Sequence, residues 1–380
     1  MRRWYGVLFI LLAAAGCTSM APVESFESAS GTESLATDEA RLWYDADRFD
    51  EQLANAGAIY PDEALQTYLQ QVLDGLYPDF KGAMRIRPFY SEEPNAFVLP
   101  NGSVYFDIGL LARVDNEAQL AAIIGHEGAH FVGRHSLKSI RTAKQHMSAV
   151  MIFEATTGVP VVGRVLAFSS MMGYSRDLER EADAIGFERL ARAGYDVREA
   201  KVPFERLARE AAVMDYDHPV FFSSHPRMTE RAESFRRMES SESAAGVTNR
   251  DLYQARTYRA VGDALSADLG ARNALVVIFL LEQEGLLEGY PPEYRHFLAE
   301  AYRLRGREGD LARAEEEYLK TMSTCPTHAP PHGALGLIRM KQGRDAEACE
   351  LFARYLALDP EAPDRVYIES YLARLQEERP

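Results

Sequence analysis

One segment near the middle of the chain constrains the fold more than any other: an apolar helix that carries two histidines and a glutamate. Residues 117–132 place their apolar side chains at helical spacing, and Gly133 is a typical residue at a helix end. Inside this helix, His126, Glu127 and His130 stand in the spacing His-Glu-x-x-His. Residues four positions apart share one helix face, so both imidazoles can reach a single metal ion, with Glu127 to one side of it. The apolar flanks indicate that the histidines do not lie on a free surface.

A catalytic zinc site also needs a third protein ligand and an open position. A second helix, which we predict over residues 176–193, offers Glu179 and Asp183 on one face. One carboxylate can ligate the metal, and the other can accept the free N–H of a ligand histidine. A structural zinc site, the alternative, usually has its fourth position closed by Cys or His, and His225 could close it here. The pattern therefore predicts one zinc ion per chain, with Glu127 as the general base.

The rest of the sequence predicts a mainly α fold of the α+β class. Residues 42–77 show helical periodicity. The period then changes, because residues 84–90 and 96–107 alternate, or are rich in β-branched and aromatic side chains, around the turn signal Asn101-Gly102. We therefore expect a small antiparallel sheet ahead of the histidine helix.

The region between the two motif helices has a different composition. Helical spacing returns at about 136–157, and residues 159–174 are then apolar with almost no charge. We interpret the second stretch as a buried loop or core helix. The alternative is a mobile lid or a membrane-touching loop near the active site, since exposed Met and Phe serve contact with membranes or unfolded chains.

Residues 1–16 have the features of a signal peptide, because Arg2 and Arg3 precede an apolar run and a cluster of small residues. The run is too short to span a bilayer. It ends in Gly-Cys, which resembles a bacterial lipobox, so we expect lipid on Cys17; an ordinary secretory signal with a chance cysteine is the alternative. Thr18 follows instead of Asp, and the resemblance to lipoprotein sorting then implies the outer membrane, facing the periplasm. Residues 17–37, rich in Ser, Glu, Ala and Thr, predict a flexible tether.

A peptidase domain is expected over residues 38–245 and a second domain over 246–380, after a Ser/Ala/Gly-rich linker. The second domain carries a 34-residue repeat, in which Ala314, Tyr318 and Pro326 recur as Ala348, Phe352 and Pro360. Small residues let paired helices approach closely, and the prolines end each second helix. We predict a tetratricopeptide-like helical domain with two clear repeats and a degenerate one at 250–290.

Charge and cysteine usage narrow the function further. A formal net charge of −15 argues against nucleic acid as a partner, because a phosphate backbone needs basic surface. Beyond Cys17, the chain has only Cys325 and Cys349. They could pair in an oxidising periplasm, but two cysteines make no disulfide framework, so we interpret them as small core residues.

Four sequence motifs together carry a family resemblance. They are the histidine motif at 126–130, the helix with Glu179, Ala182 and Asp183, the strand Asn95-Ala96-Phe97 with Pro100 and Gly102, and the segment His225-Pro226 with Arg231. Taken together they resemble metallopeptidase family forty-eight, which includes HtpX and the CAAX prenyl protease. The signal peptide and the repeats make its BepA-like periplasmic subgroup the nearest resemblance.

The resemblance implies a zincin-type metallopeptidase domain in which Glu179 is the third zinc ligand, with Glu181 as a near competitor. We expect a substrate to lie extended along the edge strand at Asn95, Ala96 and Phe97, pairing through its backbone. Arg231 is a candidate to hold a substrate carbonyl or the developing oxyanion, and a plain surface salt bridge is its alternative. Gly128 departs from the larger residue common in the family, which should weaken the helix by up to about 1 kcal/mol.

The resemblance also implies a role, that of a zinc endopeptidase in quality control or assembly of outer-membrane proteins. Its substrates would be unfolded or misassembled outer-membrane proteins, and the repeat domain would contact the assembly machinery. The alternative is a chaperone or assembly factor with silent or secondary proteolysis, although a pure binding module has no use for Glu127. We further predict that His225 gates the zinc by occupying its open position, the alternative being that it caps or packs the following helix.

Overall fold

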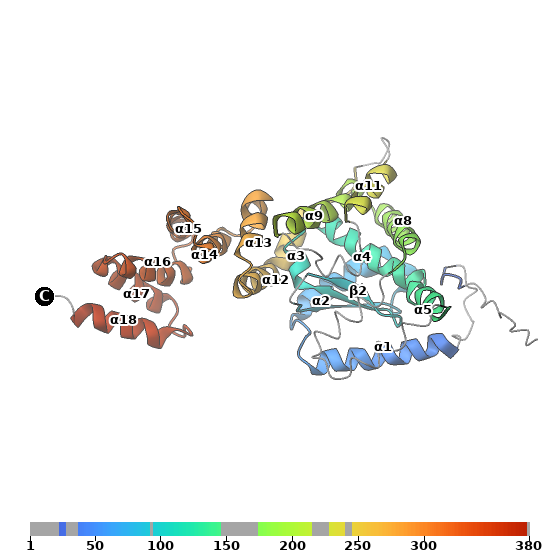
Figure 1. Ribbon diagram of the computed structural model, residues 1–380, viewed down its shortest axis with the longest axis horizontal. Helices are drawn as coiled ribbons and strands as arrows, with labels where there is room; N and C mark the ends of the chain where they lie inside the picture. Colours follow the sequence, from blue (N-terminus) through green and yellow to red (C-terminus); the bar gives the residue numbers. More distant parts are fainter. Residues whose placement is uncertain are drawn as a thin grey trace, which may run out of the picture.

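The computed structural model describes residues 23–27, 37–91, 94–145, 174–214, 228–239 and 245–377, and stacked C-terminal helices extend from a larger helical domain (Figure 1). The helices of the first part are α1 (Thr37–Asn55), α2 (Glu63–Leu76), α3 (Ile108–Leu111), α4 (Glu117–Val132), α5 (His135–Gln145), α8 (Arg176–Arg192), α9 (Val202–Met214) and α11 (Met228–Met238). Its strands are β1 (Arg85–Phe89), β2 (Ala96–Val98) and β3 (Ser103–Asp107). The C-terminal helices are α12 (Arg250–Gly270), α13 (Ala274–Ile278), α14 (Arg295–Arg305), α15 (Asp310–Thr324), α16 (Pro330–Lys341), α17 (Asp345–Leu358) and α18 (Arg365–Glu377).

The three strands form a mixed sheet in the order β1-β3-β2, so the prediction of an antiparallel sheet is wrong in part. Strands β2 and β3 are antiparallel, as the Asn101-Gly102 turn indicates, whereas β1 and β3 are parallel. The physical reason is the strand order. Because β1 and β2 run in opposite directions and β3 lies between them, β3 must be parallel to one of its neighbours.

Helices cover both faces of this sheet. On one face, Phe49 and Leu53 of α1 pack with Phe89, Phe97 and Tyr105 in a small apolar cluster. On the other, the sheet contributes Ile86, Val98 and Phe106 to the main core, together with apolar residues of α2 and α4. The helix that carries the histidine motif is therefore buried on every side, and all of its residues are buried.

Residues 23–27 lie within the tether that the sequence predicts, yet they contact the folded domain. The backbone N–H of Phe26 donates to the carbonyl of Val132 at 2.9 Å, and its ring lies 5.1 Å from that of Phe131. Glu27 pairs with Arg189 of α8. This part of the predicted tether therefore packs against the C-terminal end of α4, while the predicted signal peptide and Cys17 lie outside the described residues.

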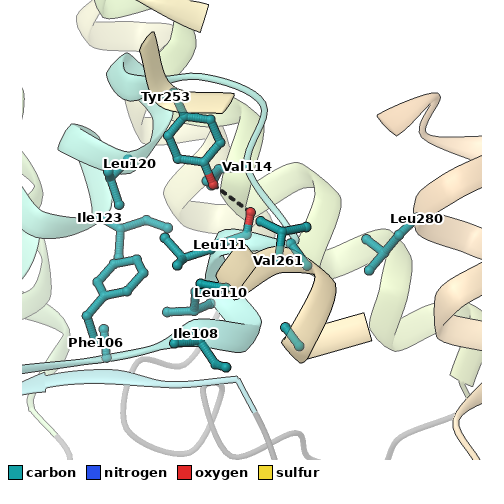
Figure 2. Packing of buried hydrophobic residues seen from close by; sticks show 14 of the residues in the cluster. Phe106, Ile108, Leu110, Leu111, Val114, Leu120, Ile123, Tyr253, Val261 and Leu280 are labelled. Atoms are coloured by element: carbon teal, nitrogen blue, oxygen red, sulfur yellow. Dashed lines mark hydrogen bonds between the residues drawn. The ribbon is translucent and has the colours of Figure 1, made fainter. Parts of the chain in front are cut away.

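The main core continues beyond residue 245, where the sequence predicts a domain boundary. Tyr253 of α12 donates its hydroxyl hydrogen to the carbonyl of Leu111 at 2.6 Å, within an apolar cluster that includes Val114 and Val261 (Figure 2). Nearby, the buried guanidinium of Arg113 lies 2.8 Å from Glu210 of α9 and 3.2 Å from Asp268 of α12. Helix α12 is thus held by apolar and ionic contacts to the first domain, and the predicted boundary stays a prediction.

The C-terminal helices pack in pairs, α14 with α15 and α16 with α17. The repeated small residues Ala314 and Ala348 are fully buried between them, as are Tyr318 and Phe352. This burial agrees with the packing that the repeat pattern predicts, whereas the assignment to the tetratricopeptide class stays a prediction. Cys325 and Cys349 are free cysteines of intermediate burial. Within the described ranges, none of the helices has both the length and the apolar character needed to cross a membrane.

Candidate metal centre

The site forms where α4 crosses α8, and both helices carry a glycine at the crossing. A Cβ atom at Gly186 would lie only 3.0 Å from the backbone nitrogen of His126 and 3.1 Å from the carbonyl carbon of Gly125. Ser175 caps the N-terminus of α8, because its hydroxyl accepts from the N–H of Leu178 at 3.4 Å. The close crossing brings the first two turns of α8, with their acidic residues, beside the motif histidines.

His126, His130 and Glu179 direct their ligand atoms at one another. The two Nε2 atoms lie 3.0 Å apart, and the carboxylate oxygens of Glu179 lie 3.5 Å from Nε2 of His126 and 3.4 Å from Nε2 of His130. All three residues are buried. In the part of the chain that the structure describes, this is the one group of His, Cys, Asp and Glu whose ligand atoms lie close enough together to hold a metal ion.

These separations fit a tetrahedral zinc site. Ligand atoms about 2.0–2.1 Å from zinc, at tetrahedral angles, stand roughly 3.4 Å from one another. The hydrogen bonding of His126 agrees, because its Nδ1 lies 2.9 Å from Oδ1 of Asp183. A neutral ring that donates from Nδ1 turns the lone pair of Nε2 toward the Glu179 carboxylate, and such a contact is repulsive unless a cation lies between the two groups.

Asp183 is held in turn by Arg231 of α11. The Nε and Nη2 atoms of Arg231 donate to Oδ1 of Asp183 at 3.1 and 2.8 Å, and the guanidinium lies 4.1 Å from the ring centre of Phe204. Arg231 is buried, so this is not the surface salt bridge considered as an alternative. The series Arg231, Asp183, His126 therefore fixes the orientation of one ligand imidazole.

Comparison with known proteins agrees with this geometry. The model of peptidase family M48 matches residues 61–239, which contain the whole His-His-Glu cluster and its outer partners. Residues 61–239 are a peptidase family M48 domain. The family prediction is thereby confirmed for this part of the chain.

Named metallopeptidases are similar to part of this chain. The mitochondrial metalloendopeptidase OMA1 of Schizosaccharomyces pombe is 35% identical over 142 residues, which cover 36% of this chain and 41% of the relative. The beta-barrel assembly-enhancing protease of Escherichia coli O157:H7 is 26% identical over 197 residues, which cover 47% of this chain and 40% of the relative. Metalloprotease YcaL of Escherichia coli K12 is 29% identical over 154 residues, which cover 39% of this chain and 59% of the relative. The chain thus spans about half the length of the curated relatives it matches.

Burial sets the protonation of the M48 site. It lowers the pKa of His126 to about 3, and the positive charge of Arg231 acts in the same direction. Burial by itself raises the pKa of Asp183, but Arg231 and the hydrogen bond to His126 outweigh it and hold that pKa below its ordinary value. At neutral pH His126 is therefore a neutral imidazole with one ring N–H, and Asp183 is an ionised acceptor for that N–H.

Glu127 and Gly128 follow His126 on α4, and Glu127 is fully buried. The space beside Gly128 is occupied by Tyr77, since a Cβ atom at position 128 would lie 2.3 Å from the tyrosine ring. The hydroxyl of Tyr77 donates to the carbonyl of Gly125. Tyr77 therefore fills the volume that a larger side chain at position 128 would need.

The predicted substrate strand lies beside α4. Strand β2 is one of the two edge strands of the described sheet, and it pairs with β3 from Ala96 to Val98. The ring of Phe97 stacks on Tyr105 at 5.1 Å, in the cluster under α1. The carbonyl of Asn95 accepts from the N–H of Asp107 at 2.9 Å. A substrate along this edge would meet backbone more than side chains, and the role of Asn95, Ala96 and Phe97 stays a prediction.

The structure leaves the predicted roles of His225 and Arg231 untested and places Glu181 away from the metal cluster. His225 and the apolar stretch up to residue 173 lie outside the described residues, so the gate and the lid stay predictions. Two nitrogens of Arg231 are engaged by Asp183, and its Nη1 lies 4.0 Å from Glu179, so an oxyanion contact stays a prediction as well. Glu181 lies outside the His-His-Glu cluster and pairs with Lys138 at 3.0 Å.

Two residues near the ligands escaped the sequence reasoning. The ring of Tyr174 stacks on His130 with centroids 3.8 Å apart, and Nδ1 of His135 lies 2.9 Å from Nδ1 of His130. Tyr174 is the last residue of the apolar stretch 159–174, and its sequence position indicates no contact with the histidine motif. His135 follows the helix end at Gly133, so helical spacing from the motif does not predict where its side chain lies.

Proposed function

We propose that this chain is a zinc-dependent endopeptidase. The observation that carries the proposal is the buried set of His126, His130 and Glu179, at zinc-like separations, with the buried Glu127 on the same helix as the two histidines. When bound, zinc would supply Lewis-acid activation of a water molecule and polarisation of the scissile carbonyl. The residues of the chain then divide the remaining work among them.

Glu127 is the general base in this proposal, because its carboxylate can accept the proton of the attacking water and return it to the leaving amine. Asp183 keeps the N–H of His126 on Nδ1, and Arg231 keeps Asp183 ionised and fixed at 2.8 Å. The substrate backbone would extend the sheet at the edge of β2, which orients the peptide along α4.

We extend the proposal to quality control or assembly of outer-membrane proteins in the bacterial periplasm. Its support is the predicted signal peptide, the predicted lipid on Cys17, and similarity to the beta-barrel assembly-enhancing protease of Escherichia coli O157:H7. Similarity to mitochondrial OMA1 supports the peptidase chemistry without this setting. Unfolded or misassembled outer-membrane proteins would be the substrates, and the C-terminal helices would contact the assembly machinery.

A second candidate function is that of a chaperone or assembly factor whose proteolysis is silent or secondary. The C-terminal helix pairs favour it, because stacked pairs form extended binding surfaces. The two functions separate at Glu127, which only hydrolysis requires.

The test is metal content and cleavage of casein by the full mature chain, for wild type and Glu127→Gln. We expect about one zinc per chain in both proteins, and a loss of cleavage by several orders of magnitude in the variant, because Gln cannot accept the proton. Undiminished cleavage by Glu127→Gln would refute the mechanism. Survival of the assembly function in cells carrying this variant would support the second candidate.

A further inference from the structure

The two predicted ligand histidines differ in their outer partners, by which we mean the residues that face the ring nitrogen turned away from the metal site. Nδ1 of His126 faces the carboxylate of Asp183 at 2.9 Å, whereas Nδ1 of His130 faces another imidazole, that of His135, also at 2.9 Å. The two rings meet edge to face, with centroids 4.9 Å apart. Because His135 is fully buried, this contact is sheltered from solvent.

The direction of the hydrogen bond follows from the ligand role of His130. Its Nε2 faces the ligand atoms of His126 and Glu179, so a neutral His130 that uses this nitrogen for a metal carries its proton on Nδ1. Nδ1 of His135 must then accept a hydrogen bond from that N–H. The proton of a neutral His135 consequently resides on Nε2, the tautomer opposite to that of His130.

Glu181 lies where this tautomer needs a negative charge. Oε2 of Glu181 is 3.4 Å from Nε2 of His135, and Lys138 holds the same carboxylate at 3.0 Å. Glu181, the alternative to Glu179 as third ligand in the sequence analysis, thus contacts His135 and not the His-His-Glu cluster. The two Nδ1 atoms of His130 and His135 are thus at hydrogen-bond distance, whereas Nε2 of His135 and Glu181 are at ion-pair distance, so the carboxylate acts on this ring through its charge.

The backbone between the ligand and its partner is shaped for this contact. Helix α4 ends at Val132 and α5 begins at His135. The two-residue turn between them directs the His135 side chain back toward His130 on α4. A Cβ atom at Gly133 would lie 2.2 Å from Nε2 of His135, and Arg134 adopts a positive φ of 52°. Both features cost backbone freedom or strain in return for placing this imidazole.

We infer that His135 is the positioning residue of His130, and that Glu181 sets the tautomer in which His135 accepts its hydrogen bond. This inference rests on the proposed zinc site. It assigns to α5 a part in the metal centre equivalent to that of Asp183 on α8. Outer partners of this kind typically change metal affinity by about 10–100-fold when they are removed.

The test measures zinc affinity of the full mature chain by competition with a chromophoric chelator, together with the visible spectrum of the cobalt-substituted protein. We expect His135→Leu, which removes the acceptor, to weaken zinc binding by about 10–100-fold and to shift the cobalt spectrum. His135→Asn should restore most of the affinity, because its carbonyl oxygen can take the place of Nδ1. Glu181→Gln should cause a smaller loss in the same direction.

His332→Leu is the matched control, since His332 is a buried histidine on α16 of the C-terminal helices. We expect it to leave both readouts unchanged. Equal zinc affinity in wild type and His135→Leu would overturn the inference alone, and so would a His135→Asn variant as weak as His135→Leu. A wild-type chain that binds no zinc would overturn the proposed function together with it.

Discussion

Gly128→Ala separates local helix propensity from packing, because the two predict opposite signs. Position 128 is interior to α4, where alanine is favoured over glycine by about 1 kcal/mol. The added methyl, however, would lie 2.3, 2.8 and 2.9 Å from three ring atoms of Tyr77. Ordinary carbon contacts need about 3.5–4.0 Å, so the ring must retreat by more than about 1 Å.

The retreat has little room, because Tyr77 is 1% exposed. Overpacking of this kind costs about 1–3 kcal/mol, and loss of the Tyr77 hydrogen bond to Gly125 costs about 1 kcal/mol more. After the gain in propensity, we expect Gly128→Ala to lower the free energy of unfolding by about 2 kcal/mol. The measurement is urea unfolding of the full mature chain, followed by circular dichroism.

Gly75→Ala is the matched control for this experiment. Gly75 lies in α2 and is exposed, and a Cβ atom there would meet no other atom within 4 Å. We therefore expect this control to raise the free energy of unfolding by up to about 1 kcal/mol. A Gly128→Ala variant as stable as Gly75→Ala would refute the packing argument. Combining Gly128→Ala with Tyr77→Leu should show a coupling energy above about 0.5 kcal/mol, because the two residues share one space.

Three further predictions concern the metal site and the buried ion pairs of Arg113. Asp183→Asn should weaken zinc binding by about 10–100-fold in a chelator competition, because the amide replaces the charge that holds the His126 N–H; unchanged affinity would remove Asp183 from the site. Glu179→Gln should lose most of the bound zinc in elemental analysis while Glu181→Gln keeps it, and the reverse result would make Glu181 the ligand. Arg113→Met should cost about 3–5 kcal/mol in urea unfolding, because it leaves the buried Glu210 carboxylate beside Asp268 without its guanidinium; Arg192→Met, which breaks an exposed pair with Glu188, should cost less than about 1 kcal/mol, and equal losses would contradict the reasoning.

The motif helix could be predicted residue by residue. Its predicted span of 117–132 is the observed span of α4, because both ends are set locally. The side chain of Asn116 accepts from the N–H of Gln119 at 3.0 Å, and Gly133 follows the last turn. Spacing within the helix then places His126 and His130 on one face, so the ligand pair depends on no distant contact.

The sheet shows where local pattern stops being sufficient. Alternation predicts that residues 84–90 and 96–107 are extended, and the Asn101-Gly102 turn predicts one antiparallel pair. Neither feature states whether β1 pairs with β2 or with β3. That choice is made by the main core, where Ile86, Val104 and Phe106 pack against α2 and α4, and it makes β1 parallel to β3.

The outer partner of His126, which is Asp183, could be predicted from the sequence, whereas His135, the outer partner of His130, could not. Asp183 lies four residues after Glu179 on one helix, so the same periodicity that predicts the ligand also predicts its neighbour. His135 acts on His130 across a turn with a positive φ at Arg134, and no periodic pattern extends through such a turn. The contacts of Arg113 could not be predicted for a related reason, since its partners Glu210 and Asp268 are 97 and 155 positions away in the sequence.

The arrangement of outer partners also explains why the helix crossing is so close. Helix α8 supplies both the third ligand, Glu179, and the partner of the first ligand, Asp183, so one distance between α4 and α8 governs two contacts of the metal site. That distance is limited by the backbone itself, because a Cβ atom at Gly186 would come within 3.0 Å of the backbone nitrogen of His126. The contact of His130 with His135 depends on a different pair of helices, α4 and α5. A change at the crossing should therefore disturb His126 and Glu179 together, and the outer contact of His130 should respond to changes in the turn at 133–134.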